Sequence, residues 1–119
     1  MSITPADFFA DSPLGLRVYE RVLEIVSAPD VTVRASRSQV KLARRRGFAY
    51  LWLPGRYLRD PAAEVVLSIA LPDRLASPRF KEVVHPSPAV WLHHLEIRSI
   101  ADVDAEVAGW LNEASTCAA

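Results

Sequence analysis

Residues 31–53 read VTVRASRSQVKLARRRGFAYLWL, and their alternation of apolar and polar side chains decides the fold. Successive side chains of a strand point to opposite faces of a sheet, so a period of two predicts strands. We expect strands at 31–35, 39–43 and 47–53, with the link Ser36-Arg37-Ser38 closing a hairpin between the first two. Pro54-Gly55 is a strong turn signal and ends the third strand.

The strand pattern continues downstream. Glu64 to Leu71 alternates and stops at Pro72, and Val90 to Arg98 is predicted as the last strand. Prolines 72, 78, 86 and 88 lie between these two segments, so residues 72–89 are predicted as one long ordered loop or flap. Loops of this length are often functional.

Helix signals flank the strands on both sides. Thr4-Pro5 and Ser12-Pro13 each place proline directly after a capping hydroxyl, and apolar residues follow at helical spacing as far as residue 26. Ser99-Ile100-Ala101-Asp102 predicts a second capped start near the C-terminus. The helix that it opens carries Trp110 on its apolar stripe, and we expect this ring to be buried against the sheet.

This order of elements indicates an α+β fold. We expect an N-terminal helix, an antiparallel sheet of about five strands and a C-terminal helix, with both helices on one sheet face. The length of 119 residues suits a single domain over 1–119. Half of the residues are hydrophobic and the net charge is zero, which excludes a disordered chain.

Composition also bounds the chemistry. No apolar run approaches the ~20 residues of a membrane-spanning helix, so we expect no membrane contact. The single cysteine, Cys117, excludes an internal disulfide and favours a cytoplasmic location. The three histidines are too scattered for a zinc site, and no glycine-rich loop could cradle phosphates, so the sequence predicts no metal and no cofactor.

The neutral net charge conceals an asymmetry. Eight basic residues and no acid lie between 31 and 59, whereas four acids and no base follow Ser99. The simplest interpretation of Arg44-Arg45-Arg46 is a solvated turn before a strand. The alternative is that segment 34–59 binds an anion or a nucleic acid.

One sheet face would remain uncovered by the helices, and it is the best candidate for a ligand or partner surface. Both faces of the third strand are apolar, so its side chains leave open whether Phe48, Tyr50 and Trp52 or their neighbours point inward. The candidate face comprises basic, aromatic and polar residues from several strands: Arg34, Lys41, Tyr50, Trp52, Ser68 and His94. Cations beside aromatic rings suit phosphates, carboxylates or stacked bases.

Three functions fit this face. The leading hypothesis is a non-catalytic binding or protein-interaction module, and a homodimer formed through the apolar part of the face is one version of it. The second is the anion or nucleic-acid binder. The third is a small hydrolase or transferase with His94 as general base, because adjacent His93 must point to the opposite, core side. No catalytic partner for His94 is evident from spacing, so one would have to come from the flap, such as His85 or Glu82.

Three motifs carry a family resemblance. They are Asp7-Phe8-Phe9-Ala10, Gly47-Phe48-Ala49-Tyr50, and residues 102–114, which read DVDAEVAGWLNEA. With them the chain resembles an uncharacterised bacterial family of small α+β domains of unknown function. The resemblance implies a fold and no reaction, and it supplies no catalytic residue.

The helix–sheet–helix order is also similar to that of frataxin-like proteins, as a fold analogy only. The resemblance implies iron handling by an acidic first helix and first strand. Arg17, Arg21 and Arg34 occupy those elements here, which disfavours that activity.

Overall fold

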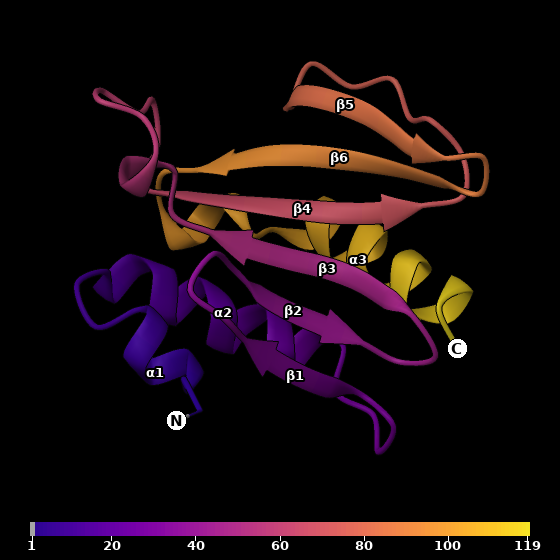
Figure 1. Cartoon of the computed structure of the whole chain (residues 1–119). Coiled ribbons are helices and arrows are strands. Elements are labelled where there is room, and N and C mark those ends of the chain that lie inside the picture. The colour runs from indigo at the N-terminus through magenta and orange to yellow at the C-terminus, as the bar shows by residue number, and fades with distance from the viewer. Residues whose placement is uncertain (1) are drawn as a thin grey trace.

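Six antiparallel strands form one sheet, and the helices cover one of its faces (Figure 1). The computed structural model describes residues 2–119. The strands are β1 (Thr32–Ala35), β2 (Val40–Ala43), β3 (Gly47–Trp52), β4 (Val65–Leu71), β5 (Phe80–Ser87) and β6 (Val90–Ile97), in the spatial order β1-β2-β3-β4-β6-β5. The helices are α1 (Pro5–Phe8), α2 (Pro13–Ile25) and α3 (Ala105–Cys117), with short 3-10 turns η1 (Pro54–Arg56) and η2 (Ile100–Asp102). The predicted α+β class and helix placement are therefore confirmed.

The N-terminal caps form as predicted. The Thr4 hydroxyl accepts a hydrogen bond from the Asp7 N–H at 3.1 Å, and the Asp7 carboxylate accepts one from the Thr4 N–H at 3.0 Å. Ser12 caps α2 by accepting from the Gly15 N–H at 3.0 Å. Both caps satisfy backbone donors that the first turn of a helix leaves without partners.

The strand faces follow the predicted alternation except at a β-bulge between β2 and β3, where the adjacent residues Phe48 and Ala49 are both buried in the core. Arg34 pairs with Lys41 across the predicted hairpin. In β3, Ala49 and Leu51 are fully buried in the core, whereas Tyr50 and Trp52 are half-buried on the open face. All seven residues of β4 are buried, because this central strand is covered by the helices on one side and flanked by larger side chains on the other.

The sheet has one strand more than expected. Residues 80–87, predicted as part of the loop 72–89, form β5 and pair with β6 at the edge of the sheet. An edge strand tolerates Pro86, since one side of its backbone needs no ladder hydrogen bonds. The prediction of a continuous flap was therefore wrong, and irregular chain remains only at residues 72–79 and at the Pro88-Ala89 turn.

The C-terminal helix also differs from the expectation. The Ser99 N–H donates to the Asp102 carboxylate at 3.2 Å, but this box opens the short η2. The N-cap of α3 is Asp104, which accepts from the Val107 N–H at 3.1 Å. Trp110 is half-buried rather than buried, and its ring packs 4.7 Å from the ring of Phe80 on β5, the strand missed at the edge.

Within residues 2–119, no helix has the length and apolar character needed to cross a membrane.

Candidate functional site

A row of polar and aromatic side chains crosses the open face of the sheet. The strand registers pair Arg34 with Lys41, Lys41 with Tyr50, Tyr50 with Ser68 and Ser68 with His94. Trp52 stands next to this row on β3, opposite Val66. The structure thus places all six predicted site residues on one face, although the row is long and its two ends are well separated.

Ser68 is the centre of a hydrogen-bonded chain within this row. Its side chain is only 2% exposed, and its hydroxyl lies 3.2 Å from Trp52 Nε1 and 2.6 Å from His94 Nδ1. An indole N–H can only donate, so Ser68 accepts from Trp52. The hydroxyl hydrogen then has one acceptor among the described residues, His94 Nδ1, and this assignment places the histidine proton on Nε2.

The protonation state of His94 follows from its surroundings. Burial lowers the pKa of His94 below its ordinary value of 6.5, and nearby Glu82 opposes this shift only in part. Neutral imidazole therefore predominates at pH 7. His94 Nε2 has no hydrogen-bond partner among residues 2–119 and is not among the fully buried polar atoms, so its N–H can donate to a bound molecule.

A pocket of about 450 Å³ opens directly over this chain. Four of the six predicted residues line it, namely Tyr50, Trp52, Ser68 and His94. The predicted site residues did not include the remaining lining residues, which are Gln39, Pro86, Ser87, Val90 and Leu92. Alternation alone puts Leu92 on the same face as His94, but Pro86 and Ser87 could not be found without the strand β5.

Arg34 and Lys41 lie on the same face but outside the pocket. The Lys41 stem and the Tyr50 ring lie over Gly47, where an added Cβ would collide with the Tyr50 hydroxyl and come within 2.7 Å of Lys41 Cε. Lys41 is therefore directed toward the Gly47 end of β3, away from Trp52. The pocket itself is mainly apolar, with a few polar groups.

Much of the basic segment serves the fold. Arg44 Nη1 donates to the Ser115 carbonyl at 3.3 Å, Arg46 Nη2 to the Cys117 carbonyl at 3.0 Å, and the Arg45 N–H to the Ala118 carbonyl at 2.8 Å. The last carbonyls of a helix lack partners and carry partial negative charge, so this run completes the C-terminus of α3. It is thus more than the solvated turn expected from the sequence.

The geometry around His94 does not favour hydrolysis. Sequence spacing suggested no serine partner for His94, yet Ser68 lies beside it. The Ser68 hydroxyl is buried under Trp52 and takes part in hydrogen bonds with both Trp52 and His94. A nucleophile must reach the substrate and needs donors for the developing oxyanion. His85 is stacked on Trp91 with 3.7 Å between ring centres, and Glu82 is the cross-strand neighbour of His94.

His93 faces the core, as expected from the alternation. It is fully buried, its Nε2 accepts from the Leu75 N–H at 3.0 Å, and its Nδ1 lies 3.0 Å from the Trp91 carbonyl. These contacts fix the loop after β4 to the sheet. His93 is therefore a structural residue on the side opposite the pocket.

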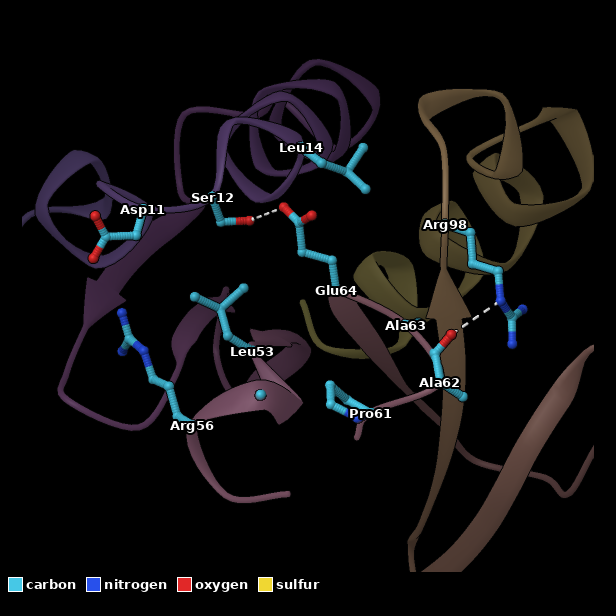
Figure 2. Close-up of a pocket in the computed structure, with 11 residues that line it drawn as sticks. Asp11, Ser12, Leu14, Leu53, Arg56, Pro61, Ala62, Ala63, Glu64 and Arg98 are labelled. Carbon is cyan, nitrogen blue, oxygen red and sulfur yellow. Dashed lines mark hydrogen bonds between the residues drawn. The ribbon is translucent and has the colours of Figure 1, made fainter. Parts of the chain in front are cut away.

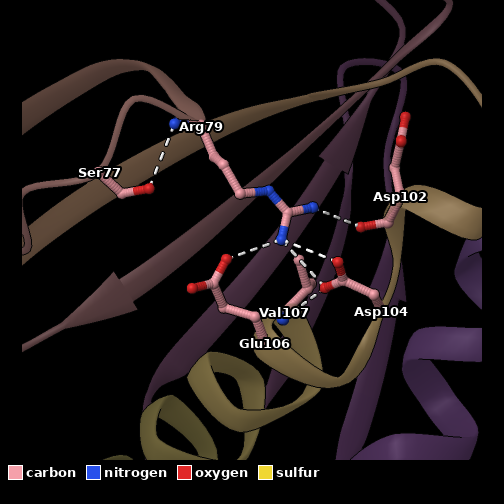
Figure 3. Close-up of polar contacts among 6 residues, drawn as sticks. All are labelled: Ser77, Arg79, Asp102, Asp104, Glu106 and Val107. Carbon is pink, nitrogen blue, oxygen red and sulfur yellow. Dashed lines mark hydrogen bonds and ion pairs between the residues drawn. The ribbon is translucent and has the colours of Figure 1, made fainter.

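Arg79 anchors the other end of the same loop (Figure 3). Its guanidinium donates to the Asp104 carboxylate at 3.0 Å, to Glu106 at 2.9 Å and to the Asp102 carbonyl at 2.9 Å. The Val107 N–H, and then Arg79, hold the pKa of Asp104 below its ordinary value. This network joins the segment before β5 to the start of α3, and so fixes the edge strand whose far end lines the pocket.

Groups of His, Cys, Asp and Glu arranged to hold a metal ion are absent from residues 2–119. Residues 6–117 match a family described as a domain of unknown function (DUF5655). The match covers almost the whole chain, so the chain belongs to this family, as its motifs indicated. Neither the curated proteins nor the solved structures contain a significant match.

Proposed function

We propose that the chain is a non-catalytic binding module, and that its open sheet face holds a small, largely apolar molecule with one hydrogen-bond acceptor. The observation that carries this proposal is the Trp52–Ser68–His94 chain beneath a pocket with apolar walls. Ligand pockets commonly combine such walls with a few fixed polar groups. The lone cysteine fits a cytoplasmic location for the module.

The pocket has the size and the surfaces for such a ligand. Its volume of about 450 Å³ falls within the usual range for small-molecule sites. Trp52 and Leu92 offer apolar area, and the Trp52 ring meets the His94 ring edge-on at 6.4 Å. A flat apolar body between these side chains would release water from both surfaces.

His94 offers the hydrogen-bond donor that would orient a ligand in the pocket. Ser68 occupies Nδ1, so the imidazole can offer only its Nε2–H to a ligand at pH 7. A carbonyl or ether oxygen would accept this hydrogen, whereas a purely apolar ligand would leave it to water. The site therefore favours an acceptor-bearing ligand over an apolar molecule of the same shape by about two- to tenfold, the usual range for one neutral hydrogen bond.

Acetophenone and ethylbenzene form a matched pair of probes, because they have similar size and differ in the carbonyl oxygen. We expect acetophenone to shift the amide signals of Leu92 and His94 and the indole signal of Trp52 in two-dimensional NMR spectra of the ¹⁵N-labelled chain. Ethylbenzene should shift the same signals with weaker affinity. His94→Leu should remove the difference between the two probes, whereas His85→Leu, outside the pocket, should preserve it.

Three outcomes contradict the proposal or part of it. Shifts spread over the surface, or none at the pocket, would show that the face does not hold a small molecule. A dimer detected by light scattering at high micromolar concentration, with Trp52 and Leu92 protected in it, would assign the face to a second copy of the chain. Equal affinity for both probes would overturn the donor role of His94.

A further inference from the structure

A second and larger pocket lies where α2 and β4 begin (Figure 2), at the end of the molecule away from the C-terminus (Figure 1). Its volume is about 580 Å³. Apolar surface comes from Leu14, Leu53 and Pro61, and four charged side chains reach it: Asp11, Arg56, Glu64 and Arg98. It shares no lining residue with the pocket over Ser68.

The carboxylate of Glu64 is fixed in this pocket. The Ser12 hydroxyl donates to Glu64 Oε2 at 2.6 Å while it accepts from the Gly15 N–H at 3.0 Å, and Ser12 is only 3% exposed. Both roles of the hydroxyl are therefore occupied. Within the described chain, Glu64 Oε1 has no hydrogen-bond partner and Glu64 forms no ion pair.

Arg56 supplies a fixed positive charge on another side. Its Nη2 donates to the Phe8 carbonyl at 2.7 Å and its Nη1 to the Arg37 carbonyl at 3.1 Å, while the guanidinium lies 4.3 Å over the Phe8 ring. These partners hold the side chain without neutralising it. No carboxylate of residues 2–119 lies within 4.0 Å of this guanidinium, not even Asp11 on the same side of the pocket.

Two fixed and opposite charges thus face a common space without pairing to each other. Figure 2 shows Leu53 between Glu64 and Arg56, so an apolar surface separates the two charges. A bound molecule that carries both charges would satisfy each of them with a charge-assisted hydrogen bond. A molecule with a single charge would satisfy only one.

We propose that this pocket binds a small zwitterion whose two charges stand at opposite ends of an apolar chain, as in an ω-amino acid. Its ammonium group bonds to the Glu64 carboxylate, its carboxylate bonds to Arg56, and its apolar body lies over Leu53 and Pro61. This second site is independent of the proposed function of the open face.

6-Aminohexanoate is the probe, and two analogues isolate its charges. Hexanoate lacks the ammonium group, and hexylamine lacks the carboxylate. We expect 6-aminohexanoate to shift the amide signals of Leu53, Gly55 and Ala63 in NMR titrations, and each analogue to bind at least about tenfold more weakly, since each loses one charge-assisted bond. 6-Aminohexanoate should not displace acetophenone from the other pocket, so the two proposals fail separately.

Variants test the assigned groups. Glu64→Gln keeps an oxygen to accept from Ser12 but removes the charge, and it should weaken the binding of 6-aminohexanoate at least about tenfold. Glu113→Gln, on the exposed side of α3, is the matched control and should leave binding unchanged. Arg56→Lys removes the planar donor pair and should also weaken binding, and it decides the question if circular dichroism shows that Glu64→Gln does not fold.

The proposal is overturned if 6-aminohexanoate leaves the pocket amides unshifted at its highest soluble concentration. It is equally overturned if hexylamine binds as tightly as 6-aminohexanoate, which would make the pocket a cation site. Unchanged affinity in Glu64→Gln would show that the zwitterion does not use this carboxylate.

Discussion

Replacing Ser68 with alanine tests the hydrogen-bonded chain on which the open-face site depends. The substitution removes two hydrogen bonds, from Trp52 at 3.2 Å and to His94 at 2.6 Å. A typical hydrogen bond contributes about 0.5–1.5 kcal/mol net. Trp52 and His94 are half-buried, so water can replace part of what they lose. We therefore expect Ser68→Ala to lower the free energy of unfolding by about 1–2 kcal/mol.

Urea denaturation measures this loss, and ¹⁵N NMR of the imidazole shows its cause. In the wild type the His94 proton should reside on Nε2, whereas Ser68→Ala should populate both tautomers. Ser68→Ala in a Trp52→Phe background should cost less than in the wild type, because the indole donor is already gone. Ser27→Ala, at an exposed serine without a side-chain partner among residues 2–119, is the matched control.

The reasoning fails if Ser68→Ala unfolds within about 0.5 kcal/mol of the wild type, well below the value of two hydrogen bonds. It fails also if the tautomer ratio of His94 is the same with and without the hydroxyl. In either case Ser68 would merely fill space under Trp52.

Three further predictions follow from the packing around the site. Burial lowers the pKa of His94, so the unfolded chain binds a proton at this histidine more readily than the folded chain does. The free energy of unfolding measured with urea should therefore fall as the pH drops below about 6.5, and it should fall less in His94→Leu. Gly47→Ala should destabilise the fold, because its Cβ would collide with the Tyr50 hydroxyl and with Lys41 Cε; a urea midpoint equal to that of the wild type would contradict the close packing. Arg79→Met should lower the urea midpoint more at low salt than at high salt, since exposed ion pairs are screened; Asp104→Ser, which keeps the helix cap, should reproduce that salt dependence.

The helix caps and the strand alternation were predicted correctly, because each depends on interactions between residues only a few positions apart. Thr4 and Ser12 cap their helices through contacts only three residues away, and the alternation of β1 and β2 set their faces without help from the rest of the chain. The Ser99 signal was real but ambiguous: it opens η2, and the chain then begins α3 separately at Asp104. A capping pattern specifies a start and not the length of the helix that follows.

The edge strand shows where local reading fails. Proline frequency indicated a loop over 72–89, but pairing with β6 stabilises residues 80–87 as a strand. Trp110 depends on the same strand, since its ring packs on Phe80. Without β5 neither the half-burial of Trp110 nor the β5 part of the pocket wall could be anticipated.

The sequence by itself determined which side chains share a face, because alternation is a property of each strand alone. It left open which face of β3 turns inward, and only packing against the helices put Tyr50 and Trp52 with Ser68 and His94 on the open side. Only the tertiary structure decided which of them touch. Strand register brings Ser68 within 2.6 Å of His94, 26 residues further on, and the packing of α2 brings Ser12 to Glu64, 52 residues away. Such distances depend on how whole elements pair and pack, and no spacing within the sequence encodes them.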